Sequence, residues 1–111
     1  MTPSLFGVKA FGMVIIREEF AVYIPNAFTP NNDGVNDYFM ALGLGIKEFD
    51  MFVYDRWGLR TFYSSDIKKG WDGKMQGSDT PCQMDVYIYK INIKDTQGKM
   101  HNYIGRVSLV K

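Results

Sequence analysis

The fold is decided by the stretch Asp85-Val86-Tyr87-Ile88-Tyr89-Lys90-Ile91-Asn92-Ile93-Lys94. Its apolar residues recur at every second position, which puts Tyr87, Tyr89, Ile91 and Ile93 on one face of an extended chain. The five residues 95–99 contain Asp and Gly and are typical of a hairpin loop. Residues 102–110 then alternate again, with Tyr103, Val107 and Leu109 expected to point inward. The stretch therefore predicts one half-buried strand of a long hairpin.

The same alternation extends through the rest of the chain. Residues 20–24 and 49–55 have the pattern of strands, and residues 59–63 follow a tight turn as the partner of the second. Strands recur every eight to twelve residues with turn chemistry between them, and the helical period is absent. This spacing predicts an all-β fold: a single immunoglobulin-like antiparallel β-sandwich of about seven strands.

Composition supports one globular domain. The 111 residues are 46% hydrophobic, 23% charged and 15% aromatic, and rings pack well across strands. Because 13 basic and 12 acidic residues give a net charge of +1 with no basic stripe, we expect no nucleic-acid partner.

The single Cys82 excludes an intrachain disulfide. Residues 5–16 are mildly apolar but interrupted by Lys9, so neither a signal peptide nor a transmembrane segment is predicted.

Two regions are expected along the chain. Residues 1–19 form either an N-terminal leader or the first edge strand, and residues 20–111 form the sandwich domain.

Five sequence blocks in order resemble one known family. They are Ile24-Pro25-Asn26-Ala27-Phe28-Thr29-Pro30-Asn31-Asn32-Asp33-Gly34-Val35-Asn36-Asp37-Tyr38-Phe39, Val53-Tyr54-Asp55-Arg56-Trp57-Gly58, Gly70-Trp71-Asp72-Gly73, Val86-Tyr87-Ile88-Tyr89 and Gly105-Arg106-Val107-Ser108-Leu109-Val110-Lys111. Together they resemble the gliding-motility-associated C-terminal domain, the type B sorting domain of the type IX secretion system of Bacteroidota. The resemblance covers about residues 22–111.

The resemblance implies a function without catalysis. Such domains form immunoglobulin-like sandwiches at the C-terminus of exported proteins, where outer-membrane translocon proteins recognise them. These translocon proteins pass the upstream cargo domains from the periplasm to the cell surface or medium. This chain differs from the pattern at Asn32 and Asp85, where Gly is usual, and it lacks the cargo.

The loop 29–37 has the composition of a weak Ca²⁺ site. Its candidate ligands are Asn31, Asp33, Asn36 and Asp37, with Gly34 allowing a sharp bend. In the alternative interpretation, these side chains bond to their own backbone in Asx turns, and the domain has no cofactor.

Two groups of residues are candidates for recognition by the translocon. The first is Asp55, Arg56 and Trp57 at a strand end; the second is Val107, Leu109 and Lys111 in the last strand, where strand addition at a sheet edge is one physical route. In the structural alternative for the first group, Asp55 and Arg56 pair with each other or with turn amides, and Trp57 packs on the sandwich edge.

The sequence leaves two other functions open. One is an immunoglobulin-like adhesive module whose loops bind glycan or protein, with or without Ca²⁺. The other is the folded remnant of a truncated gene. An enzyme is not predicted, because no nucleophile elbow surrounds a serine and a sandwich of this size rarely offers a substrate cleft.

Overall fold

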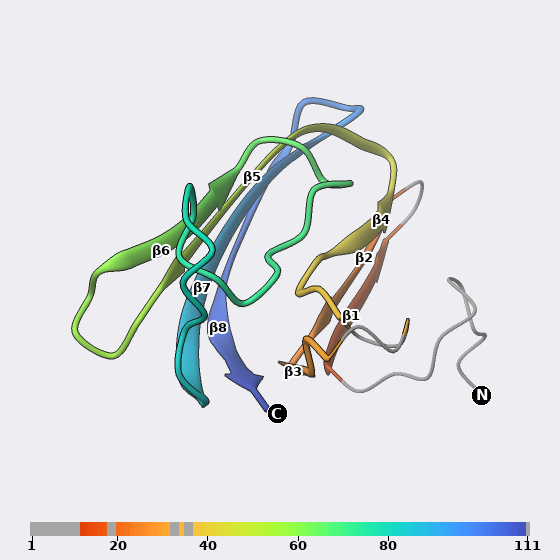
Figure 1. The fold of residues 1–111 in the computed structure, drawn as a ribbon. Coiled ribbons are helices and arrows are strands. Elements are labelled where there is room, and N and C mark those ends of the chain that lie inside the picture. Colours follow the sequence, from red (N-terminus) through yellow and green to blue (C-terminus); the bar gives the residue numbers. More distant parts are fainter. Residues whose placement is uncertain (1–11, 18–19, 32–33, 35–36, 111) are drawn as a thin grey trace.

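The computed structural model describes residues 12–17, 20–31, 34 and 37–110, which form two sheets packed face to face (Figure 1). The strands are β1 (Gly12–Arg17), β2 (Phe20–Pro25), β3 (Ala27–Phe28), β4 (Leu42–Leu44), β5 (Ile46–Tyr54), β6 (Arg60–Ser64), β7 (Asp85–Asp95) and β8 (Met100–Leu109). The predicted all-β sandwich is confirmed, with eight strands in the described part of the chain. Within the described ranges, no helix has the length and apolarity needed to cross a membrane.

The larger sheet has the strand order β3-β8-β7-β5-β6. Its centre is the predicted hairpin, in which β7 and β8 pair from Asp85↔Leu109 to Lys94↔Met100. Gly98 closes the hairpin loop at a φ of 87°, a conformation that Gly adopts without steric cost. The alternating residues Tyr87, Tyr89, Ile91 and Ile93 are all buried, as the sequence predicts.

The order β8-β7-β5-β6 is that of the G, F, C and C′ strands in variable-type immunoglobulin domains. The β5–β6 hairpin is longer than its sequence pattern, because β5 begins at Ile46 and only its later part alternates clearly.

The smaller sheet has the order β1-β2-β4, with β1 as an edge strand. After Pro25 the chain crosses from β2 to the larger sheet, where β3 pairs with the end of β8 in parallel. This two-residue contact is the one parallel pairing in the sheets of the described residues, and the other strand pairs are antiparallel.

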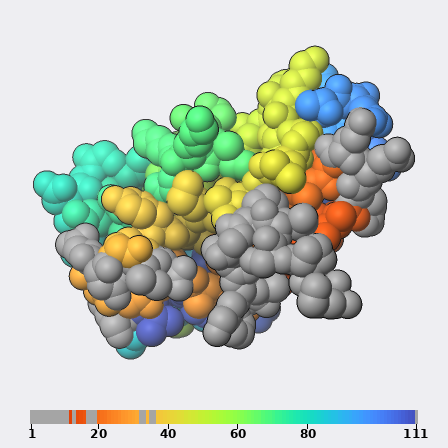
Figure 2. Space-filling view, turned by 90° about the vertical axis from the view of Figure 1, so that its right-hand side faces the viewer, coloured from red at the N-terminus to blue at the C-terminus, as the bar shows by residue number. Residues whose placement is uncertain are grey.

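The core is closed by the segment 65–84 between β6 and β7. Trp71 from this segment is fully buried and exchanges two backbone hydrogen bonds of 2.9 Å with Phe39. Its indole Nε1–H donates to the Lys74 carbonyl at 2.8 Å, and its ring lies edge-on to Tyr87. Figure 2 shows this segment, green to teal, beside the yellow residues that lead into β4. It covers the core on a side where the smaller sheet has only three strands.

The segment also covers the outer edge of β6. The Gln76 side chain accepts a hydrogen bond from the Tyr63 N–H and donates one to the Tyr63 carbonyl, at 2.9 and 2.8 Å. The Gln76 N–H donates to the Thr61 carbonyl at 3.0 Å. One glutamine thus replaces part of a neighbouring strand and protects an edge that could otherwise pair with another chain.

Candidate functional site

The turn between β5 and β6 is held by Asp55. Its Oδ1 accepts hydrogen bonds from the backbone N–H groups of Trp57 and Leu59, both at 2.9 Å. The Asp55 and Leu59 backbones are also bonded, and Gly58 takes a φ of 83°. Asp55 therefore binds turn amides, and the turn presents its remaining side chains from a fixed backbone.

The structural alternative expected Arg56 to pair with Asp55 or with a turn amide. Arg56 instead binds Asp85. Its Nη2 donates to Asp85 Oδ1 at 2.6 Å, across from the turn to the first residue of β7. Arg56 and the Val86 N–H, both bonded to this carboxylate, hold the pKa of Asp85 below its ordinary value. The same ion pair raises the pKa of Arg56. This charge-assisted contact ties the turn to the central strand.

Trp57 is 73% exposed, so the expectation that it packs on the sandwich edge is wrong. The turn carries it past Tyr54 and Arg60, the last paired residues of β5 and β6. The Arg56 guanidinium lies 5.5 Å from the centre of the Trp57 ring. An exposed indole stacked with an arginine is a combination enriched in protein interfaces.

A small cleft of about 290 Å³ lies behind this turn. Its lining includes Asp55, Trp57, Cys82, Asp85 and Tyr87. The Tyr87 hydroxyl donates to the Gln83 carbonyl at 2.7 Å. Burial is the largest cause that raises the pKa of Tyr87 to about 12, and the nearby Cys82 and Asp85 add to it. The hydroxyl therefore stays a neutral donor. The cleft is suited to receive an apolar side chain next to the ion pair.

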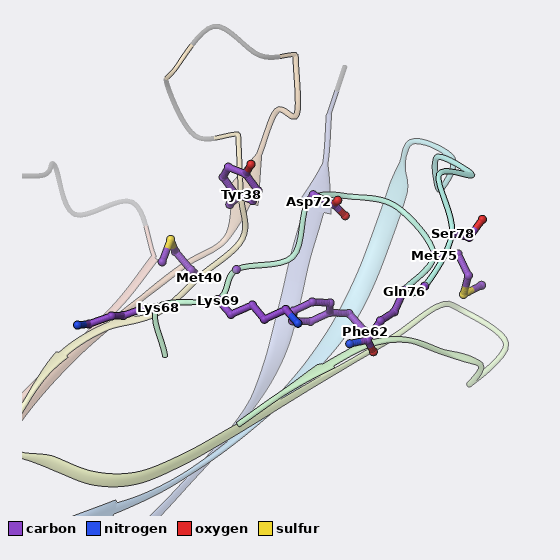
Figure 3. A pocket seen from close by; sticks show the side chains of 11 residues that line it. Tyr38, Met40, Phe62, Lys68, Lys69, Asp72, Met75, Gln76 and Ser78 are labelled. Carbon is purple, nitrogen blue, oxygen red and sulfur yellow. The ribbon is translucent and has the colours of Figure 1, made fainter. Parts of the chain in front are cut away.

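A larger cleft of about 630 Å³ lies on the other side of Met75. Figure 3 shows Tyr38 and Met40 on one side of it and Met75, Gln76 and Ser78 on the other. Lys68 and Lys69 add positive charge at its rim, and both are exposed. Met75 lines both clefts, so they border one another along the covered edge of β6.

The recognition candidates in the last strand lie on its inner face. Val107 is fully buried and Leu109 is 1% exposed, so a docked partner could not contact either side chain without opening the core. Lys111 falls outside the described residues. The surface of β8 is formed instead by its even-numbered residues.

The candidate Ca²⁺ loop is only partly described. Asp33 and Asn36 lie outside the described residues, and Asn31 is exposed. Asp37 Oδ2 accepts a hydrogen bond from the Gly34 N–H at 2.8 Å, whereas its Oδ1 is buried and has no hydrogen-bond partner among the described residues. Among the residues that can be placed, no three His, Cys, Asp or Glu side chains gather as a metal site would require. A cation in this loop stays a prediction.

A comparison with family models matches residues 22–107 to the CHU_C type IX secretion signal domain. The match runs from β2 into the end of β8 and includes the Asp55–Leu59 turn. The chain belongs to the type IX secretion signal domain family. The signal domain is therefore a sorting signal of that pathway, and the family is not a catalytic one. No curated protein matches the chain.

Sequence reasoning missed two parts of this site. Asp85 appeared only as a departure from the usual Gly, although it supplies the partner of Arg56. The clefts around Met75 depend on how the segment 65–84 folds back, which no local pattern indicates. For the contact between Arg56 and Asp85, the one available signal in the sequence was a carboxylate at the start of the strand that pairs with β5.

Proposed function

We propose that the outer-membrane translocon of the type IX pathway recognises this domain and exports cargo joined to it to the cell surface. In finer terms, it acts as a type B, gliding-motility-associated sorting domain of a Bacteroidota protein. The observation that carries the proposal is the family match across residues 22–107. Any cargo precedes the domain in the chain, and its identity is independent of the recognition step.

The Asp55–Leu59 turn is the proposed contact with the translocon. Trp57 is exposed but held by a turn that Asp55 bonds twice, so little conformational freedom is lost when a partner binds it. Tryptophan and arginine are the side chains that most often dominate binding energy in interfaces. The cleft behind the turn offers space for a partner side chain next to Trp57.

The test is an export assay in a bacterium that has the type IX pathway. The full chain is fused behind a signal peptide and a fluorescent passenger, and surface and medium fluorescence are compared with periplasmic fluorescence. We expect export that disappears when the translocon is deleted. A passenger alone, without the domain, provides the control for leakage.

Retention of the passenger in the periplasm would contradict the proposal if protease resistance shows that the domain is folded there. The adhesive-module and gene-remnant hypotheses would then account better for the chain.

A further inference from the structure

Among the described residues, one side of the β8 backbone has no strand paired with it along much of its length. The Ser108 and Val110 N–H groups donate to the Asn26 and Phe28 carbonyls, away from β7, at 2.9 and 3.0 Å. At the other end, Asp95 N–H donates to Lys99 O, which places odd-numbered residues on the β7 side. Peptide groups alternate sides along a strand, and the register of β7 with β8 has no shift. Asn102, Ile104 and Arg106 therefore direct their N–H and C=O groups away from β7.

Strand β3 covers this edge only at its end. It pairs with Ser108 and Leu109 and has two residues. Within the described part of the chain, no backbone group bonds to the outward peptide groups of Asn102, Ile104 or Arg106. The contrast with β6 is clear, since there Gln76 occupies the edge.

The side chains beside this edge are apolar and positive. Ile104 is 69% exposed, and Arg106 is exposed two residues further on. Their neighbours on the same outer face are Lys90, opposite Ile104, and Ile88, opposite Arg106. An exposed isoleucine is unusual at a strand edge, where charges normally prevent pairing with other chains.

The acidic residues of the outer face lie elsewhere. On β5, the residues opposite Lys90 and Ile88 are Phe52 and Tyr54. Asp50 and Glu48 lie further along and already contact Asn92 and Lys94, at 2.8 and 3.6 Å. Within the described residues, the cross-strand rows that contain Ile104 and Arg106 include positively charged side chains but no Asp or Glu. These rows favour a partner that supplies one.

We propose that the edge of β8 at residues 102–106 accepts an extended strand from a protein of the secretion machinery. The incoming strand places an apolar side chain beside Ile104 and a carboxylate beside Arg106, so that backbone pairing and cross-strand contacts act together. The inference rests on the proposed function and adds a second contact surface to the turn. Both lie toward the same end of the larger sheet, since Arg106, Ile88 and Tyr54 form one cross-strand row.

The substitution Ile104→Pro tests the backbone part. Proline removes only the outward N–H of residue 104, because the β7 ladder uses odd-numbered residues, and proline is accepted at such edge positions. Ile104→Ala removes the side chain and keeps the N–H. In the export assay, we expect Ile104→Pro to lower surface export by about tenfold, well beyond the effect of Ile104→Ala. Thermal unfolding of both purified variants checks that they are folded.

A charge reversal tests the side-chain part independently of proline. Arg106→Glu is expected to lower export by about fivefold, because it places like charges across the new strand pair. Lys47→Glu makes the same charge change at an exposed position near the opposite end of β5, and we expect it to leave export unchanged.

The outcomes separate the two proposals. Failure of the unmodified domain to export its passenger contradicts the proposed function. Normal export by the unmodified domain, by folded Ile104→Pro and by Arg106→Glu would overturn the edge inference and leave the function standing. If Ile104→Pro does not fold, the comparison of Arg106→Glu with Lys47→Glu decides the inference.

Discussion

Arg56 and Asp85 join the β5–β6 turn to the first residue of β7 through a guanidinium–carboxylate contact of 2.6 Å. The two residues are 29 positions apart in the chain. The Asp85 side chain is the less exposed partner, at 13% against 58% for Arg56. The contact therefore orients Arg56, and Arg56 in turn lies over Trp57.

Replacing Asp85 with Asn should loosen the turn without unfolding the domain. The substitution keeps an oxygen acceptor for the Val86 N–H but removes the charge that holds Arg56. We expect a several-fold loss of export with a small change in unfolding midpoint, because a partly exposed ion pair contributes little to stability. Export by Asp85→Asn equal to that of the unmodified domain would show that the orientation of Arg56 is irrelevant to recognition.

Trp57→Ala should separate recognition from folding. The indole is 73% exposed, so its loss is expected to change the free energy of unfolding by no more than about 0.5 kcal/mol. Export should fall by about tenfold or more if Trp57 anchors the partner. The control is Met100→Ala, which removes another exposed apolar side chain from the far end of the β7–β8 hairpin. Equal export by the two variants would argue against the turn as the contact.

Trp71→Ala should destabilise the domain strongly, and Trp71→Phe less so. Trp71 is fully buried against Phe28 and Tyr87, and removing it leaves a cavity that costs about 3–5 kcal/mol. Trp71→Phe keeps most of the ring but leaves the Lys74 carbonyl without its indole donor, at a cost of about 2 kcal/mol. Urea unfolding followed by circular dichroism measures both. A loss below 1 kcal/mol for Trp71→Ala would contradict the burial of this residue.

Acid should weaken the fold through Asp95. Hydrogen bonds from His101 and from the Lys99 and Gln97 N–H groups lower the pKa of Asp95 below its ordinary 3.8. A carboxylate with a lowered pKa adds stability above its unfolded pKa, and this stability is lost as the pH falls through the lower folded value. The urea midpoint should therefore decline below about pH 4.

Asp95→Asn tests this directly, with His101→Phe as its companion. The asparagine variant should be less stable at pH 7 and lose less on acidification. His101→Phe retains a ring stacked on Phe20 but removes the largest cause of the pKa shift. Identical acid profiles for all three proteins would exclude Asp95 as the titrating group.

Gln76→Glu should reopen the edge of β6. The glutamate can still accept from the Tyr63 N–H but has no donor for the Tyr63 carbonyl. We expect a loss of about 1 kcal/mol, and more for Gln76→Ala, which removes both contacts. Because uncovered edges pair with other chains, sedimentation should detect self-association of Gln76→Ala at high concentration. A monomeric, fully stable Gln76→Ala would show that the edge needs no cover.

The sequence was sufficient for the large hairpins but not for the short strands. Period-two alternation identifies β7 and β8 because more and less exposed residues alternate along both strands, although in β8 only Val107 and Leu109 are buried. Strand β4 has three residues, one of them Gly43, and β3 has two, so neither carries a readable pattern. Their pairing is set by where Pro25 and the Trp71 segment direct the chain, which is a matter of tertiary packing.

The candidate site was predictable by residue but not by geometry. The turn Asp55–Arg56–Trp57 could be selected as a unit because it joins two alternating strands. Its ion pair to Asp85 depends on the register of β5 with β7, which the sequence does not reveal. The inward orientation of Val107 and Leu109 does follow from alternation. Their selection for recognition rested on their place in the last strand, where strand addition at a sheet edge is one physical route, and their contact with a partner stays a prediction.

Direct binding to the translocon tests the central claim best. The purified full chain, and its folded Trp57→Ala variant, would be titrated against the purified outer-membrane translocon in detergent. The account predicts saturable binding by the unmodified domain and at least about tenfold weaker binding by Trp57→Ala. Absence of saturable binding by the folded, unmodified domain would contradict it.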